Sequence, residues 1–206
     1  MNKDVINFAG NPIYVSRGNE IASTKELDHL RNINKIFIEN NKTLKLSESS
    51  HIFKDKQLKN IEQILLNNFN DYKKDVLQIN DSFYICNSWC TLQTKGGSHH
   101  NHVHPNAIFS AVYYAKAEKS VLIFYLDRSK LQENFHFSYE IKNYNIYNSC
   151  SWSVEVNAGD VIIFPGHLRH QSPVCEIDER IIVSSSFFVK GKLGDQNTYN
   201  DIYLNG

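Results

Sequence analysis

The chain has 206 residues, a length that suits one domain with a substantial core. Its 22 basic and 22 acidic residues cancel, so the composition gives no electrostatic sign of binding to nucleic acid or to an anionic membrane. No apolar run reaches the roughly 20 residues that a membrane-spanning helix needs, and no signal-peptide pattern is present. The four cysteines form no C-x-x-C pair. Together these features predict a cytoplasmic protein with reduced thiols.

The N-terminal part, about residues 1–80, predicts helical support for a later β region. Ser23-Thr24-Lys25-Glu26 is a capping-box pattern followed by an apolar period, which predicts a helix over residues 24–40. A second apolar period predicts a helix over residues 55–72. Both helices are amphipathic, so each is expected to lay one face on a neighbouring element.

The pattern becomes strand-like from residue 83 to about residue 190. Strands are predicted over residues 83–93, 107–115, 121–126, 152–156, 160–164 and 181–189, with an aromatic stretch at 135–147. Several short strands after two helices predict a mainly β, α+β domain, a sandwich or barrel with the helices packed outside. We expect one domain over residues 1–206, with 191–206 as a loop-like tail or an edge extension.

Three histidines form a candidate metal site. His102 and His104 are two residues apart, so on a strand they point the same way. His170 is the best third ligand, because it follows a strand that ends at a proline. Imidazole suits iron, copper, zinc and nickel, and three of them leave coordination positions open. His99 and His100 are interpreted as polar loop residues or adventitious metal binders.

Arg180 opens the last predicted strand, on the same face as Ser184. An arginine that points into a barrel is costly unless it meets an anion, and a carboxylate can accept two hydrogen bonds from it with a third from a serine. The alternative is a surface ion pair with the preceding loop. That loop offers Glu176, Asp178 and Glu179.

The whole motif set resembles the 2-oxoglutarate/Fe(II) oxygenase superfamily. The segment His102–Tyr114 reads HVHPNAIFSAVYY and is followed by Gly159, Phe164-Pro165, His170 and Arg180 in order. It looks like a small branch found in bacteria and phages in which H-x-H-P precedes an S-G-V-Y-Y-type strand; Trp89 and Gly96-Gly97 also resemble that branch. The resemblance covers roughly residues 83–189.

This resemblance implies a double-stranded β-helix, also called a jelly roll or cupin-like barrel. By it, His102 and His170 carry over as Fe(II) ligands and Arg180 as the partner of the distal carboxylate of 2-oxoglutarate. Tyr113 or Tyr114 would line the cosubstrate site, and we favour Tyr113. The superfamily usually has a carboxylate where this chain has His104, so either His104 ligates, which we favour, or it lies behind the ligands.

The implied reaction is the oxidation of an unknown substrate, usually a hydroxylation, coupled to conversion of 2-oxoglutarate to succinate and CO₂. We expect residues 127–149 to shape the substrate entrance. A homodimer is compatible with the sequence. Two alternatives stay open: a cupin-type metal enzyme that does not use 2-oxoglutarate, and a jelly-roll binding module without activity. Arg180 distinguishes the cupin-type enzyme from the oxygenase, because a cupin does not need a residue that binds the carboxylate of 2-oxoglutarate.

Overall fold

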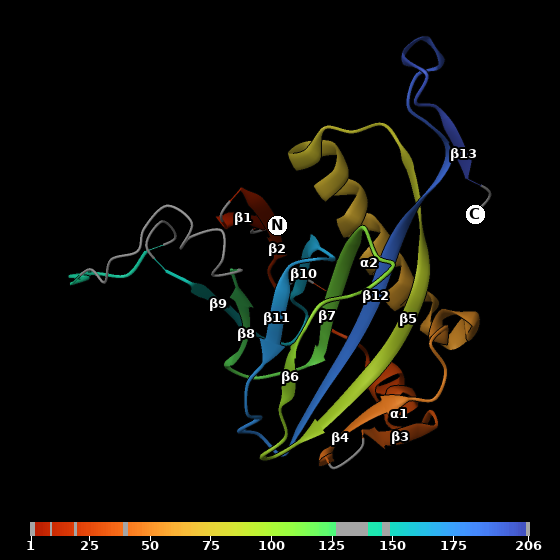
Figure 1. Cartoon of the computed structure of the whole chain (residues 1–206). Coiled ribbons are helices and arrows are strands. Elements are labelled where there is room, and N and C mark those ends of the chain that lie inside the picture. The colour runs from red at the N-terminus through yellow and green to blue at the C-terminus, as the bar shows by residue number, and fades with distance from the viewer. Residues whose placement is uncertain are drawn as a thin grey trace.

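Two antiparallel sheets form the body of the protein, and helix α2 covers the outer face of the larger sheet (Figure 1). The computed structural model describes residues 3–8, 10–18, 20–38, 41–126, 140–145 and 149–204. The larger sheet contains β1 (Lys3–Phe8), β2 (Asn11–Ser16), β3 (Lys35–Ile38), β4 (Asn41–Ser47), β5 (Ser82–Thr94), β7 (Phe109–Lys116), β10 (Val161–Pro165), β12 (Glu179–Leu193) and β13 (Ile202–Leu204). The smaller sheet contains β6 (His99–His102), β8 (Ser120–Tyr125), β9 (Ser151–Val156) and β11 (Arg169–Ser172).

The order of the strands is that of a double-stranded β-helix, as the resemblance implied. The larger sheet runs β1-β2-β10-β7-β12-β5-β4-β3, with β13 paired to β12, and the smaller sheet runs β6-β11-β8-β9. Neighbours along the chain are therefore often not neighbours in a sheet, and the connections cross between the two layers. The expected strands from residue 83 onward are confirmed where the structure describes them. Of the aromatic stretch 135–147, residues 135–139 and 146–147 lie outside the described residues.

Side chains that alternate along β7, β10 and β12 divide the interior into two cores. Tyr113 and Val183 face outward and join the core formed with α2 (Lys59–Asp71), together with Leu65 and Phe69 of that helix. The residues that alternate with these along the same strands face inward and form a second core between the two sheets. That second core includes Val112, Tyr114, Leu122, Phe124, Val154, Ile162, Phe164 and Ile182.

The first predicted helix is shorter than expected. The capping box is present, with Ser23 and Glu26 bonded to one another, but α1 ends at Asn32 and residues 35–38 form β3. Ile33 takes an extended conformation, and the Lys35 ammonium donates to the carbonyls that the helix end leaves free, including those of Arg31 and Ile33. The prediction of a helix to residue 40 is therefore wrong beyond this cap.

The second predicted helix is confirmed in its centre only. Two 3₁₀ turns, η1 (Ile52–Lys54) and η2 (Lys56–Leu58), precede α2, and a π-helical turn, η3 (Tyr72–Leu77), extends it. The N-terminal region is also not purely helical, because β1 to β4 join the larger sheet. At the other end, β12 continues to Leu193 and β13 folds back onto it after the 3₁₀ turn η4 (Gln196–Thr198), so the tail is an edge extension that projects from the barrel (Figure 1).

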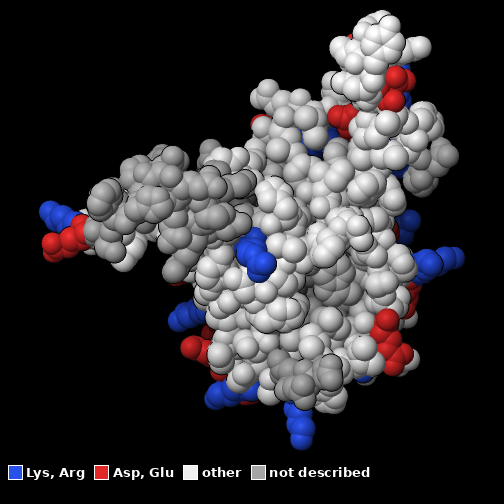
Figure 2. All heavy atoms as spheres, in the orientation of Figure 1, with Lys and Arg blue, Asp and Glu red and all other residues white. Residues whose placement is uncertain are grey.

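The surface shows no concentration of one charge on the face in Figure 2, where basic and acidic side chains are scattered around the described part of the molecule. This distribution agrees with the balanced composition. Within the described ranges, no helix is long and apolar enough to cross a membrane.

The contact between α2 and the larger sheet gives a stability prediction. Phe69 is 2% exposed, and its ring stacks on that of Phe187 with centroids 3.9 Å apart. Phe69→Ala should lower the free energy of unfolding by about 3–5 kcal/mol, because it leaves a cavity between the helix and the sheet. Urea denaturation measures this. Tyr144→Ala, at a side chain that is 73% exposed, is the control and should change stability by less than about 0.5 kcal/mol; similar losses in both variants would contradict this packing.

Candidate functional site

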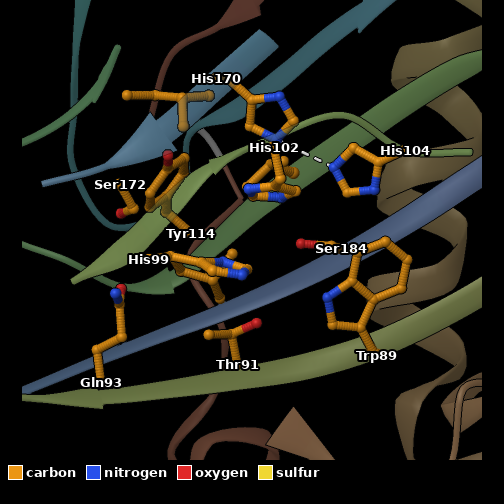
Figure 3. A pocket seen from close by; sticks show the side chains of 13 residues that line it. Trp89, Thr91, Gln93, His99, His102, His104, Tyr114, His170, Ser172 and Ser184 are labelled. Atoms are coloured by element: carbon orange, nitrogen blue, oxygen red, sulfur yellow. Dashed lines mark hydrogen bonds between the residues drawn. The ribbon is translucent and has the colours of Figure 1, made fainter. Parts of the chain in front are cut away.

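A cavity opens between the two sheets and is lined by side chains from both (Figure 3). Its empty volume is about 410 Å³, a figure that includes open solvent at its mouth. The lining residues are Trp89, Thr91, Gln93, His99, His102, His104, Val112, Tyr114, Leu122, His170, Ser172, Ile182 and Ser184. The cavity therefore contains all three histidines that the sequence singled out, and Ser184 as expected.

The three predicted histidines meet at one end of this cavity. His102 on β6 and His170 on β11 are directly opposite one another in the antiparallel pair. One ring nitrogen of each of His102, His104 and His170 lies within 4.8 Å of the others. The Nε2 atoms of His104 and His170 are 3.0 Å apart. Residues separated by up to 68 positions in the sequence thus present their nitrogens to one point.

Backbone carbonyls fix the orientation of two of these rings. The Nδ1 atom of His102 donates to the carbonyl of His100 at 2.8 Å, and that of His170 donates to the carbonyl of Leu168 at 2.9 Å. In a neutral imidazole this places the proton on Nδ1 and leaves the lone pair on Nε2, the tautomer that a metal ligand needs. Burial lowers the pKa of His102, and lowers those of His104 and His170 to about 3, so the rings stay neutral near pH 7.

These donors fit a divalent metal ion of the first transition row. Two nitrogens that each stand about 2.1 Å from one ion at a right angle are about 3.0 Å apart, which is the separation between the His104 and His170 nitrogens. Three neutral imidazoles on one side of an ion leave open positions on the other side, as non-haem iron enzymes require. Iron held here would be bound by His102, His104 and His170.

His104 reaches this point from the irregular segment that follows β6, just before a turn at residues 105–106. We expected His102 and His104 on one strand, but β6 ends at His102 and His104 follows it. The backbone amide of His104 donates to the carbonyl of Gly166 at 2.9 Å. Gly166 must be glycine here, because a Cβ atom would stand 2.4 Å from the carbonyl oxygen of Ala107. The Trp89 ring, 5.2 Å away between centroids, packs beside the His104 imidazole.

His99 also lines the cavity, which sequence reasoning missed. Strict alternation would place His99 and His102 on opposite faces, because they are three residues apart. The pairing of β6 with β11 contains an irregularity, His102 lying opposite His170 and His99 opposite Ser172, so both rings turn the same way. Their rings stack with centroids 4.2 Å apart. His99, His100 and His102 form a second group close enough to hold an ion, and it shares His102 with the first.

Arg180 is buried near the part of the cavity that lies away from His104. Its side chain is 2% exposed, and its guanidinium donates to the Gln93 Oε1 atom at 2.7 Å, to the hydroxyl of Ser120, and to the carbonyl of Pro173 at 2.8 Å. All three partners are neutral, and burial lowers the pKa of Arg180. Figure 3 shows Gln93 on the opposite side of the cavity from His104.

The alternative of a surface ion pair for Arg180 is wrong. Glu179, the nearest acidic residue in sequence, instead pairs with Arg31 at 2.9 Å and with Lys116 at 3.0 Å. Among the residues that the structure describes, no carboxylate forms an ion pair with Arg180. A buried guanidinium without a counter-charge is costly, so its place beside a cavity indicates an anion-binding site.

The expectation for the tyrosines is wrong as to which one faces the cavity. Tyr113 points to the outer core, and its hydroxyl donates to the carbonyl of Glu20 at 2.7 Å. Tyr114 lines the cavity and is fully buried. The two tyrosines point to opposite faces of the strand, as predicted. Tyr113 is on the outer face because α2 packs there, which leaves Tyr114 on the inner face. Gln93 and Ser172 also line the cavity and were not predicted, because an isolated polar residue on a strand gives no local signal.

The two histidine groups give a prediction that separates them. Replacing His104 with alanine should lower the affinity for Co(II) or Fe(II) at least about tenfold, since losing even a residue behind a ligand costs 10–100-fold. His99→Ala is the matched control and should change the affinity by less than about threefold. Anaerobic competition against a chromophoric chelator measures both. A greater loss in His99→Ala would assign the ion to the other group.

The buried imidazoles predict a pH dependence for the metal-free protein. The pKa values of His104 and His170 are about 3 in the folded state and 6.5 ordinarily. Between these values the unfolded chain binds more protons, so stability rises with pH there. The free energy of unfolding should therefore fall as the pH is lowered from about 6.5 toward 3, by up to about 1.4 kcal/mol per pH unit for each histidine.

Urea denaturation of the metal-free protein across this range measures the slope. His104→Gln replaces the imidazole with a side chain of similar size that does not titrate. The free energy of unfolding of this variant should therefore fall less steeply as the pH is lowered. An identical slope in the variant would show that His104 is not held neutral by the fold.

The comparisons with known proteins agree with this geometry. Residues 87–187 match the model of a family described as "Putative 2OG-Fe(II) oxygenase". No curated protein sequence that was compared matches the chain.

Solved structures share the fold at low sequence identity. HygX from Streptomyces hygroscopicus, with nickel and 2-oxoglutarate bound, is 11% identical and aligns with a TM-score of 0.57 over 85% of this chain and 82% of its own. A 2OG-Fe(II) oxygenase family oxidoreductase from Burkholderia pseudomallei is 10% identical, with a TM-score of 0.54 over 78% and 75%. SnoN, an α-ketoglutarate-dependent epimerase of nogalamycin biosynthesis, is 10% identical, with a TM-score of 0.57 over 80% and 71%.

The motif, the barrel and the family match all concern the same part of the chain, which contains every histidine of the candidate centre and Arg180. Residues 87–187 form a domain of the 2-oxoglutarate/Fe(II) oxygenase superfamily.

Proposed function

We propose that this protein is a 2-oxoglutarate- and Fe(II)-dependent dioxygenase, a hydroxylase in the simplest case, in which His102, His104 and His170 bind the iron. The observation that carries the proposal is the buried charge of Arg180 beside a cavity that holds three neutral imidazoles. A molecule with a metal-chelating group and a carboxylate at its other end would satisfy both parts of the cavity at once. 2-Oxoglutarate has this form.

Different residues of the cavity have different roles in the proposed reaction. With iron, 2-oxoglutarate and O₂ bound, the chemistry supplied is oxidation of a substrate C–H bond coupled to loss of CO₂ and formation of succinate. The imidazoles, held by the carbonyls of His100 and Leu168, fix the place of the ion. Val112, Leu122 and Ile182 form apolar walls, which exclude water from the bound cosubstrate.

The charges of the site suit this cosubstrate. Three neutral histidines leave the full charge of a divalent ion, of which the chelating carboxylate offsets one unit. The distal carboxylate is then offset by the charge of Arg180 in a poorly solvated place. Ser184 also faces the cavity and is proposed to contact the cosubstrate. The neighbouring structure of HygX with nickel, 2-oxoglutarate and hygromycin B supports the idea that a barrel of this kind admits a cosubstrate and a small molecule together.

A cupin-type enzyme that does not use 2-oxoglutarate would have the same barrel and the same three histidines. It would leave the buried Arg180 unexplained, and so would a binding module without activity. The expected substrate entrance at residues 127–149 falls mostly outside the described residues. Cytoplasmic location and a homodimer stay predictions from the sequence.

An anaerobic binding titration tests the proposal. The Fe(II)-loaded protein should bind 2-oxoglutarate with the appearance of a visible absorption band, because the ligand chelates the ion. Arg180→Ala should weaken 2-oxoglutarate binding by about 10- to 100-fold, since hydrogen bonds to a charged group contribute roughly 1.5–3 kcal/mol, while Fe(II) affinity changes less than about threefold.

Arg169→Ala is the matched control, because Arg169 stands next to His170 on β11 but is exposed. It should leave both affinities unchanged. Arg180→Lys keeps the charge and should bind 2-oxoglutarate with intermediate affinity. Equal loss of iron and 2-oxoglutarate in Arg180→Ala, with Arg169→Ala unaffected, would contradict the assigned role.

A further inference from the structure

We propose that His99, His100 and His102 form a second metal-binding site, the outer site, through which a divalent transition-metal ion enters the protein. The inner site is the centre of His102, His104 and His170 described above. The ion passes from the outer site to the inner site while it stays bound to His102, the residue that both contain. The inference rests on the proposed function for the role of the inner site, whereas the outer site is argued from its own residues.

The first observation is a cluster of three imidazoles on one short strand. The sequence of β6 is His99, His100, Asn101 and His102. The ring centroids are 5.1 Å apart for His99 and His100, 5.4 Å for His100 and His102, and 4.2 Å for His99 and His102. One ring nitrogen of each lies within 4.8 Å of the others. Two nitrogens on opposite sides of one ion are about 4.2 Å apart, so small side-chain rotations bring all three onto one ion.

The local structure explains why these rings gather. His100 lies two positions from His102, the spacing at which side chains of a strand point the same way. The irregular pairing of β6 with β11 turns His99 toward His102 as well. Figure 3 shows the rings of His99 and His102 next to one another in the cavity. The cluster is therefore built by the strand and its pairing rather than by the order of residues alone.

The second observation is that the two sites share a single lone pair. The Nδ1 atom of His102 donates to the carbonyl of His100 at 2.8 Å, so Nε2 is the nitrogen left to bind an ion. Because one lone pair binds one ion, the two sites cannot both be fully ligated at the same time. An ion in the outer site reaches the inner one when His104 and His170 replace the two outer ligands. Their nitrogens lie within 4.8 Å of the His102 nitrogen, so this movement is short.

The third observation is that exposure falls from the outer site to the inner one. His100 is exposed, His99 and His102 are partly exposed, and His170 is only 3% exposed. A hydrated ion must exchange water for protein ligands before it enters a poorly solvated place. The outer imidazoles provide the first of these ligands at the surface, and imidazole suits iron, cobalt, nickel, copper and zinc alike. The outer site is therefore the place where an ion from solvent first binds.

A double variant tests whether the outer site binds metal by itself. Replacing both His104 and His170 with alanine removes two inner ligands and leaves the outer three. This variant should still bind Co(II), with an affinity at least about tenfold below that of the wild type, as measured by visible absorption in anaerobic titrations. Adding His100→Ala should weaken this remaining binding at least about tenfold more. Adding His167→Ala instead, at another exposed histidine that belongs to neither site, should change it less than about twofold.

The uptake rate tests whether the outer site lies on the path of the ion. His100→Ala in the otherwise unchanged protein should slow Co(II) uptake at least about fivefold in stopped-flow mixing, because the entry path has lost a ligand. The equilibrium affinity, which the inner site determines, should stay within about threefold. Release of the ion to an excess of chelator should then slow by the same factor as uptake. His167→Ala is again the control and should change neither rate. Because His100 is exposed, its replacement leaves the packing of the barrel intact.

The outcomes distinguish this inference from the proposed function. Loss of Co(II) binding in the double variant, while the wild type binds Co(II) and 2-oxoglutarate, would overturn the outer site and leave the proposed function standing. Unchanged uptake and release in His100→Ala would also overturn the inference, even if the double variant binds Co(II), because the ion then enters by another route. A wild type that binds metal but not 2-oxoglutarate would contradict the proposed function, whereas the outer site would be supported by slower uptake in His100→Ala.

Discussion

The alternation of side chains along β7, β10 and β12 is the constraint on which the rest of the structure depends. These central strands are covered on both faces, by α2 on one side and by the smaller sheet on the other, so each successive residue belongs to a different core. Two of the inward residues that line the cavity, Ser184 and Tyr114, are polar. The outward residues hold the helix that keeps the sheet in place.

Within that frame, the polar groups of the cavity fall into two chemically different sets. One set consists of neutral imidazoles whose protons are fixed by backbone carbonyls, which suits a cation. The other set surrounds a guanidinium that no carboxylate in the described part of the chain neutralises. Separating a cation site from an anion site in a poorly solvated space favours a ligand that carries both a chelating group and a distant negative charge.

Several residues of the candidate site could be predicted from the sequence, because the spacing of motifs along the chain indicates which side chains come together. His102 and His170 follow from a histidine pair before a strand and from a proline-terminated strand, and Arg180 follows from its place at the head of an apolar strand. Alternation along the strand puts Tyr113 and Tyr114 on opposite faces but does not show which face is inside, because that depends on where α2 packs. The place of His99 in the cavity cannot be predicted from its own strand, because it depends on the irregular pairing of β6 with β11.

The opposition of His102 and His170 across β6 and β11 has a consequence for assembly. β6 is a four-residue strand at the edge of the smaller sheet and pairs only with β11 among the described strands. A shift of one residue in that pairing would turn one of the two imidazoles to the other face. An ion that needs both rings would bind only the correct pairing, so its binding would favour that register of the edge strand over shifted ones.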